Sequence, residues 1–307
     1  MIRMPSDPFQ GPLPPLTAKQ SALGDVLRRH VEQLAGVIGE RNLFRPSQLA
    51  AAADYIESVL QKVGLSVQRQ RYEVSGKPTD NVEAEVTGAG RRDEILVVGA
   101  HYDSVHGSPG ANDNATGVAA VLALAQAIAR TRPSRTIRFV LFANEEPPFF
   151  QGPHMGSRVY AQRSRRRDDK IRLMLSLETI GYYTDEPNSQ RYPFPFSFFY
   201  PSTGNFIAFV SNRAHASVVK HLLSSFRRHA AFPSEGGALW ESIPGIAWSD
   251  HWSFWQEGYP AVMITDTAPN RYPQYHTASD RPDMVDIPRM ARVVDGLEHV
   301  IHELADE

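Results

Sequence analysis

Six residues that can bind metal ions or move protons directly follow, or closely precede, apolar segments of the chain. They are His101, Asp113, Glu145, Glu146, Glu178 and His276. In open α/β sheets, ligands bind beyond the carboxyl ends of the strands, so side chains at these ends meet at one edge. Carboxylates gathered there would repel one another, and a pair of divalent cations is the simplest compensation. The pattern therefore predicts a metal centre built from imidazole and carboxylate groups.

Each of these residues also has an ordinary interpretation when it is taken alone. A lone histidine such as His101 is usually an ordinary loop residue. An aspartate before a helix, such as Asp113, is usually a cap that accepts hydrogen bonds from free backbone N–H groups. The adjacent Glu145 and Glu146 would usually form a solvated surface pair. Glu178 is the exception, because it follows Met-Leu-Ser-Leu and carboxylates are seldom buried without a partner. The joint placement of the residues, rather than any single one, favours the metal hypothesis.

Short apolar runs would position these residues. Residues 94–100, 136–143, 171–177 and 261–265 are nearly continuous apolar runs, which is typical of central strands covered on both faces. Residues 115–129, between the first two runs, are small, apolar and helical in pattern. Strand, helix and strand in this order indicate a βαβ unit.

Further segments complete an α/β pattern. Helices are predicted for residues 16–38, 47–63, 214–228 and 290–304, and half-buried strands for residues 66–74 and 81–87. We therefore expect a three-layer α/β/α fold with a central mixed, largely parallel and twisted sheet. We expect residues 1–15 to form an extended N-terminal arm and residues 16–307 to form one domain. That domain would carry an insertion near residues 182–206, which are rich in Pro, Tyr and Phe.

The composition argues against several classes of protein. The chain has 307 residues and a formal net charge of -2, which gives no reason to expect nucleic acid or an anionic membrane as a partner. Cysteine is absent, which excludes thiolate ligands and disulfides and favours an extracytoplasmic location, secreted or periplasmic. Residues 1–15 hold no apolar core of a signal peptide. No run approaches the ~18 apolar residues needed to span a bilayer.

Four short motifs resemble those of a known family. Residues 99–104 are Gly-Ala-His-Tyr-Asp-Ser, and residues 110–117 are Gly-Ala-Asn-Asp-Asn-Ala-Thr-Gly. Residues 144–146 are Asn-Glu-Glu, and residues 275–277 are Tyr-His-Thr. As an ordered set, they resemble the secreted bacterial leucyl-type aminopeptidases of metallopeptidase family twenty-eight. The resemblance runs from residue 49 to the C-terminus and leaves out the insertion.

The resemblance implies a zinc-exopeptidase fold with two zinc ions per chain. Asp113 would bridge the two ions. His101 and Glu178 would complete one site, and Glu146 and His276 would complete the other. Zinc accepts neutral histidine and carboxylate oxygen in catalytic sites that keep one position open. The implied function is release of the N-terminal residue of a peptide substrate by metal-activated water.

The resemblance also implies roles for two catalytic residues. Glu145 would be the general base that takes a proton from the water and passes it to the leaving amine. Tyr275, directly before the last ligand, would polarise the scissile carbonyl and stabilise the developing oxyanion. A cis peptide bond between Asp113 and Asn114 is a further expectation from the resemblance.

Supporting residues are predicted next to the ligands. Asp103, two residues after His101, could accept the distal ring N–H of that histidine. Asp280 could do the same near His276, or could instead cap a helix, and Asp250 could buttress the site. Four aromatic residues could line a substrate pocket or simply pack in the core: Phe149, Phe150, Trp252 and Trp255.

Other activities stay open at this stage. Glu178 stands where most aminopeptidases of the family have aspartate, so hydrolysis is better supported than the aminopeptidase direction. A glutaminyl cyclase, which belongs to the same family, would use one zinc, and cyclases tend to have tryptophan at the position of Tyr275. A non-catalytic binding module of the same fold would be expected to lack ligands or the base. All five ligands and the base are present here.

Overall fold

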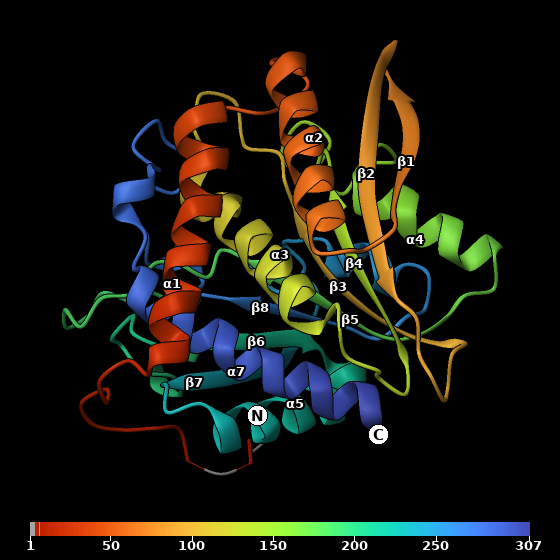
Figure 1. Ribbon diagram of the computed structural model, residues 1–307. Helices are drawn as coiled ribbons and strands as arrows, with labels where there is room; N and C mark the ends of the chain where they lie inside the picture. Colours follow the sequence, from red (N-terminus) through yellow and green to blue (C-terminus); the bar gives the residue numbers. More distant parts are fainter. Residues whose placement is uncertain (1–3, 6) are drawn as a thin grey trace.

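An eight-stranded sheet forms the middle layer of the computed structural model, which describes residues 4–5 and 7–307 (Figure 1). The strands are β1 Val67–Val74, β2 Lys77–Val86, β3 Glu94–His101, β4 Thr136–Phe142, β5 Lys170–Glu178, β6 Ile207–Asn212, β7 Ser234–Leu239 and β8 Ala261–Thr265. Their order across the sheet is β1-β2-β4-β3-β5-β8-β6-β7. The pairs β4–β3, β3–β5, β5–β8 and β6–β7 are parallel, and the others are antiparallel. The prediction of a mixed, largely parallel sheet is confirmed.

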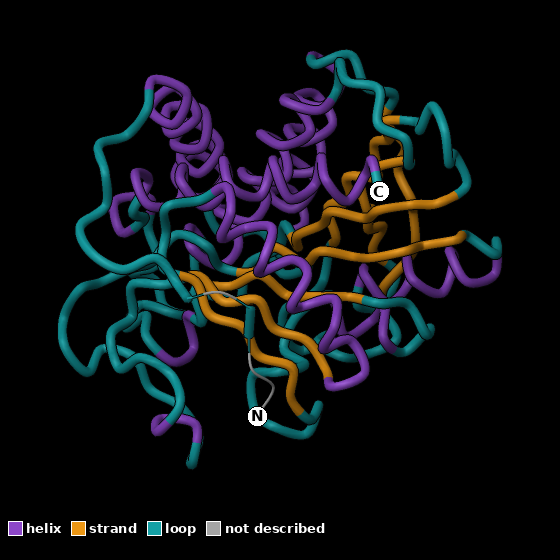
Figure 2. The backbone as a smooth tube through the Cα atoms, turned by 90° about the horizontal axis from the view of Figure 1, so that it is seen from below, coloured by secondary structure: helices purple, strands orange, loops and turns teal. Residues whose placement is uncertain are grey.

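Helices cover both faces of the sheet. They are α1 Ala18–Val31, α2 Pro46–Lys62, α3 Thr116–Ile128, α4 Gly156–Arg166, α5 Ala216–His229, α6 His251–Trp255 and α7 Ile287–Asp306. Helices α1, α2, α3, α5 and α7 share one apolar core with the sheet, while α4 and α6 share the core on the other face. Figure 2 shows the same layers from below, with a broad group of loops at the left of the view. In the described residues, none of the helices is long and apolar enough to cross a bilayer.

Helix α3 approaches strand β5 closely at Gly117. A Cβ atom on this residue would lie 2.4 Å from the carbonyl oxygen of Leu177 and equally close to Asn114 Oδ1. Glycine is therefore required for the start of α3 to lie against the end of β5. Asn114 fixes the same junction, because its Nδ2 donates to Leu177 O at 2.9 Å. This contact holds Asp113 next to Glu178.

Four elements of the structure were not predicted from the sequence: α4, α6, β6 and β7. Strand β7 reads Ser-Glu-Gly-Gly-Ala-Leu, and its two glycines weaken the signal for a strand. Helix α6 has only 5 residues, which is too short to display helical periodicity. The predicted strands and helices all occur, with ends that shift by a few residues.

The insertion and the N-terminal arm contain little regular structure. Within residues 182–206, the only helical turn is the short 3-10 turn Phe196–Phe198. In the predicted arm, residues 1–3 and 6 lie outside the described residues. Met4 and Leu13 pack against the core, and Pro5 O accepts a hydrogen bond from Arg227 Nη1 at 2.7 Å. The described part of the arm therefore lies against the domain.

Candidate active site

The five predicted ligands come from separate parts of the chain and meet at one edge of the sheet. His101 is the last residue of β3, and Glu178 is the last residue of β5. Asp113 lies in the turn before α3, and Glu146 follows β4. His276 lies in the loop after β8 and has a positive φ of 59°. All but His276 are buried, so the sheet edge collects the cluster that the strand-end argument predicts.

The Asp113 carboxylate lies between the two histidines. Its Oδ1 is 3.2 Å from His101 Nε2, and its Oδ2 is 3.1 Å from His276 Nε2. Glu178 Oε2 lies 3.3 Å from His101 Nε2, and Glu146 Oε2 lies 3.2 Å from His276 Nε2. The cluster thus consists of two groups of three residues that share Asp113. The peptide bond that follows Asp113 is cis, as expected.

The donor set fits metal ions. His101 Nε2, His276 Nε2, Asp113 Oδ1 and Glu146 Oε1 are all buried, and none of them has a hydrogen-bond partner among the described residues. His101 Nε2 and Asp113 Oδ1 approach to 3.2 Å without hydrogen-bonding, as they would if both pointed toward a shared third atom. Buried polar atoms are rarely left unpaired. Imidazole nitrogen and carboxylate oxygen are also the ligands that catalytic zinc accepts.

The electrostatics of the cluster are those of crowded acids with cationic neighbours. Burial raises the pKa of Glu146 to about 7, and the Asp113 carboxylate adds to this rise. Burial also acts to raise the pKa of Asp113, but the two flanking histidines outweigh it and hold that pKa below its usual range. Burial would lower the pKa of His276, yet its contacts with Asp113 and Glu146 raise it to about 10. Because these side chains neutralise one another, replacing any one of them would leave the charge of its partner buried and uncompensated.

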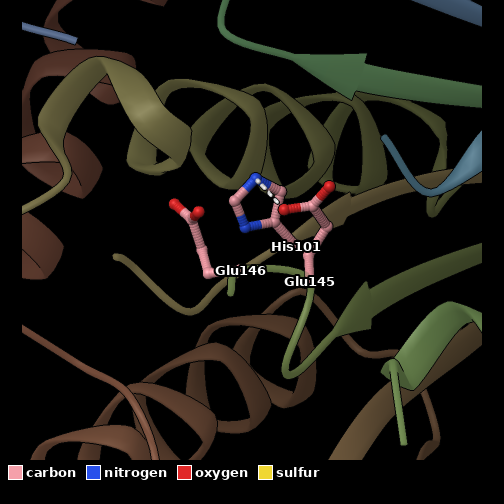
Figure 3. A group of neighbouring side chains, drawn as sticks. All are labelled: His101, Glu145 and Glu146. Atoms are coloured by element: carbon pink, nitrogen blue, oxygen red, sulfur yellow. Dashed lines mark ion pairs between the residues drawn. The ribbon is translucent and has the colours of Figure 1, made fainter. Parts of the chain in front are cut away.

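Glu145 lies against the cluster from the other side of the His101 ring. Figure 3 shows Glu145 and Glu146 on either side of this imidazole. Glu145 Oε2 is 3.9 Å from His101 Nε2. Burial, together with Glu178 and Glu146, holds the pKa of Glu145 well above its ordinary value against the opposing effect of His101. Geometry alone also groups Glu145 with His101 and Glu146 as three possible ligands.

Asp103 supports both His101 and the loop that carries the two glutamates. Its Oδ1 lies 3.4 Å from His101 Nδ1, on the side where the sequence places it, at ion-pair distance but without a hydrogen bond. In addition, its two oxygens accept hydrogen bonds from the backbone N–H groups of Glu145 and Glu146, each at 3.1 Å. One buried carboxylate therefore positions a histidine of one strand and the residues that follow the next strand.

Asp280 contacts a different ligand from the one predicted. Its carboxylate accepts from the backbone N–H of Asn112 at 2.8 Å and of Asp113 at 3.1 Å, and from the Tyr272 hydroxyl at 2.9 Å. It therefore positions Asp113 rather than His276. The alternative prediction, a helix cap, agrees better with the structure. Asp280, although distant in sequence, caps the turn that leads into α3.

The hydrogen bond that braces Glu178 comes from the residue before Asp250. Ser249 Oγ donates to Glu178 Oε2 at 2.7 Å and lies 3.0 Å from Ser176 Oγ. Asp250 itself is fully buried, and burial raises its pKa to about 7. The serines were not predicted, and only their position in the fold identifies them.

Arg41 is a positioning residue that the sequence does not signal. Its fully buried guanidinium donates to the carbonyl oxygens of Tyr102 and Pro109 at 2.6 Å and of Gly110 at 2.8 Å. Burial lowers the pKa of Arg41 to about 10, so it is still a cation at neutral pH. Arg41 therefore ties the segment after His101 to the segment before Asp113.

Replacing Arg41 by methionine is expected to lower the free energy of unfolding by about 3–5 kcal/mol, the usual effect of breaking a buried charged network. The reason is that the carbonyl groups of Tyr102 and Pro109 would lose the charged donor that they share. Urea unfolding of the metal-free chain measures the change. Arg45→Met is the control, since the side chain of Arg45 is 57% exposed. A loss below about 1 kcal/mol for Arg41→Met would contradict this role.

A cavity of about 120 Å³ opens next to the cluster. Glu178 and Tyr275 lie at its edge, and several of its walls come from residues 182–206. The Tyr275 ring stacks on His276 with centroids 3.9 Å apart. The four aromatic residues predicted as possible pocket walls do not line this cavity: Phe149, Phe150, Trp252 and Trp255. The tryptophan that does line it is Trp248, which sequence periodicity does not single out.

Fold and site together define a class of protein, namely a three-layer α/β protein with a histidine–carboxylate cluster that could hold metal ions at the carboxyl edge of its sheet. Comparison with known proteins gives the family. The model of Peptidase family M28 matches residues 81–301, and the chain belongs to this family.

Individual relatives agree with this membership. The chain is 36% identical over 304 residues to YfbL, an uncharacterized protein of Escherichia coli (strain K12), with 94% of this chain and 90% of that protein covered. It is 25% identical over 232 residues to the probable leucine aminopeptidase 1 of Trichophyton verrucosum (strain HKI 0517). That match covers 70% of this chain but only 56% of the fungal protein, so the chain spans little more than half the length of that relative.

Solved structures share the fold. The zinc aminopeptidase BSAP from Bacillus subtilis superposes with a TM-score of 0.73 at 15% identity, covering 92% of this chain and 95% of that one. The glutaminyl cyclase of Bacteroides thetaiotaomicron superposes with a TM-score of 0.70 at 17% identity, covering 91% and 97%. At these identities the likeness establishes the fold and does not choose between the two activities.

Proposed function

We propose that the protein is a zinc-dependent aminopeptidase that binds two zinc ions and releases N-terminal residues from peptides. One observation carries the proposal: two histidine–carboxylate groups share Asp113, and Glu145 lies against them. The name of the fungal relative, a probable leucine aminopeptidase, supports the same activity. Zinc is supported by the donor set and by the zinc aminopeptidase of the same fold.

The ligand roles follow the two groups of the cluster. Asp113 would contribute one oxygen to each site. His101 and Glu178 would complete the first site, and Glu146 and His276 would complete the second. When bound, zinc supplies Lewis acidity that lowers the pKa of water and polarises a carbonyl group.

Glu145 would hold and move the proton. Its carboxylate faces the cluster, and its backbone N–H is fixed by Asp103, so its position does not depend on a ligand contact. Because burial favours the protonated form, Glu145 can keep a proton taken from water long enough to pass it to the leaving amine. A carboxylate with a raised pKa is suited to act first as base and then as acid.

Tyr275 would orient and polarise the substrate carbonyl. Burial and the neighbouring carboxylates hold the pKa of its phenol well above the ordinary value, so the hydroxyl keeps its proton at neutral pH. The group can therefore donate a hydrogen bond to an oxygen on which negative charge develops. Its ring is held in place by stacking on His276.

A glutaminyl cyclase is the second candidate, because a cyclase shares the fold. Tyr275 and the complete pair of ligand groups favour the peptidase. The two activities separate in one experiment, in which the purified protein is given aminoacyl p-nitroanilides and, separately, a peptide with N-terminal glutamine. Release of p-nitroaniline supports the proposal. Cyclisation of glutamine without any amide hydrolysis would establish the cyclase instead. The absence of both activities would favour a binding module.

A further inference from the structure

The cavity next to the cluster is built on one face of the sheet. Glu178 pairs with Thr265, Thr265 pairs with Ala208, and Ala208 pairs with Glu235. These four residues form one row across β5, β8, β6 and β7, and all four line the cavity. Figure 1 shows β8, β6 and β7 side by side in the lower half of the molecule. A predicted metal ligand and a second glutamate thus lie at opposite ends of the same row.

The register sets the distance between the two glutamates. Neighbouring strands lie about 4.8 Å apart, so three steps separate the backbones of Glu178 and Glu235 by roughly 14 Å. Paired residues in a row project from the same face of the sheet. The carboxylate of Glu235 is therefore well removed from the position of the scissile bond, yet it belongs to the same cavity.

Glu235 forms no hydrogen bond or ion pair with any residue in the part of the chain that the structure describes, although it is half-buried. The groups around it are engaged elsewhere. Tyr200 Oη donates to Gly236 O at 3.0 Å, and Tyr192 Oη donates to Pro201 O at 2.8 Å. Arg227, which acts on Glu235 through space, donates to Ser234 Oγ at 3.1 Å.

The walls of the cavity suit a long aliphatic stem. Tyr192 and Tyr200 stack with centroids 5.6 Å apart, and Phe206 lies on a neighbouring wall. Lysine and arginine bury their methylene groups along such surfaces while the charged head reaches a polar partner. Aromatic faces also attract the cationic head.

We propose that this cavity receives the side chain of the substrate's N-terminal residue and that Glu235 selects lysine or arginine there. The proposal rests on the aminopeptidase function proposed above. The substrate α-amine cannot be the partner of Glu235, because it lies only two bonds from the scissile carbonyl carbon. An acidic side chain would be repelled, and a neutral one of equal length would leave the half-buried carboxylate unpaired.

Lysyl and norleucyl p-nitroanilides provide the test, because both side chains have the same four carbon atoms and only lysine adds a terminal, charged nitrogen. The wild-type chain is expected to prefer the lysyl substrate by about 10- to 100-fold in kcat/KM, the range for a hydrogen bond to a charged group. Glu235→Gln is expected to remove this preference, chiefly by lowering kcat/KM for the lysyl substrate. Glu73→Gln is the matched control, since Glu73 is an exposed glutamate on β1 at the opposite edge of the sheet.

The outcomes separate this proposal from the function on which it rests. If the wild-type chain cleaves both substrates equally well, or if Glu235→Gln keeps the preference, the assignment of Glu235 is overturned and the aminopeptidase stands. If no anilide is cleaved, the aminopeptidase function fails. Calorimetric titration with lysinamide and norleucinamide then tests the preference of the cavity for a cationic side chain without any catalysis. Equal binding of the two amides would overturn the proposal. Neither the wild-type comparison nor the titration requires the variant to fold.

Discussion

Replacing Glu145 by glutamine is expected to lower kcat by about 10²–10⁴-fold, the usual contribution of a positioned proton transfer. The amide cannot accept the proton of the attacking water, yet it has nearly the size of the carboxylate. The backbone N–H of residue 145 still donates to Asp103, so the loop should keep its shape. The variant should therefore retain its fold and its zinc. Steady-state hydrolysis of an aminoacyl p-nitroanilide and zinc content after dialysis measure the two effects.

Glu146→Gln is the matched control for this prediction. It alters the adjacent residue, whose Oε2 lies 3.2 Å from His276 Nε2, and should weaken zinc binding as well as turnover. The neighbouring pair thus separates proton transfer from coordination. Near-normal turnover of Glu145→Gln on a substrate that the wild-type chain cleaves would rule out the proposed base.

Replacing Asp113 by asparagine is expected to abolish activity through loss of zinc. Asp113 is the one residue common to both ligand groups, so a neutral amide there weakens both sites at once. Changing a residue that merely supports a ligand lowers metal affinity about 10–100-fold, and the loss of a shared anionic ligand should exceed this. Zinc titration in the presence of a competing chelator measures the change in affinity, and circular dichroism checks the fold.

Asp93→Asn is the control for the shared ligand, because the side chain of Asp93 is 77% exposed at the surface. It should bind zinc and turn over substrate as the wild-type chain does. If Asp113→Asn keeps full zinc content in both sites, the bridging role is wrong even when activity is lost.

The sequence predicts the part of the site that depends on strand ends. His101 and Glu178 follow apolar runs that are typical of central strands, and Glu146 follows a third such run. Parallel strands present their carboxyl ends at one edge, so their convergence follows from topology. Asp113 and His276 lie in loops next to these strand ends, so the same argument included them, and the resemblance to a known family then implied the role of each as a ligand.

Long-range polar contacts could not be predicted in this way. Asp280 reaches the backbone of Asp113 across 167 positions of the sequence, and Arg41 reaches Pro109 across 68. No periodicity or motif encodes such partners, because they depend on how loops from different elements come together. Strand β7 was not predicted for a local reason, because its glycines give little strand signal. Glu235 and the cavity depend on this strand and were therefore not predicted either.

Zinc content of the purified wild-type chain, measured by elemental analysis after dialysis, tests the central claim most directly. We expect close to two zinc ions per chain, which should be lost together with peptidase activity on chelation and restored together with it when zinc is added back. One zinc per chain with cyclisation of N-terminal glutamine would support the cyclase. A chain that binds no zinc while its fold is intact would contradict the metal centre assigned to His101, Asp113, Glu146, Glu178 and His276.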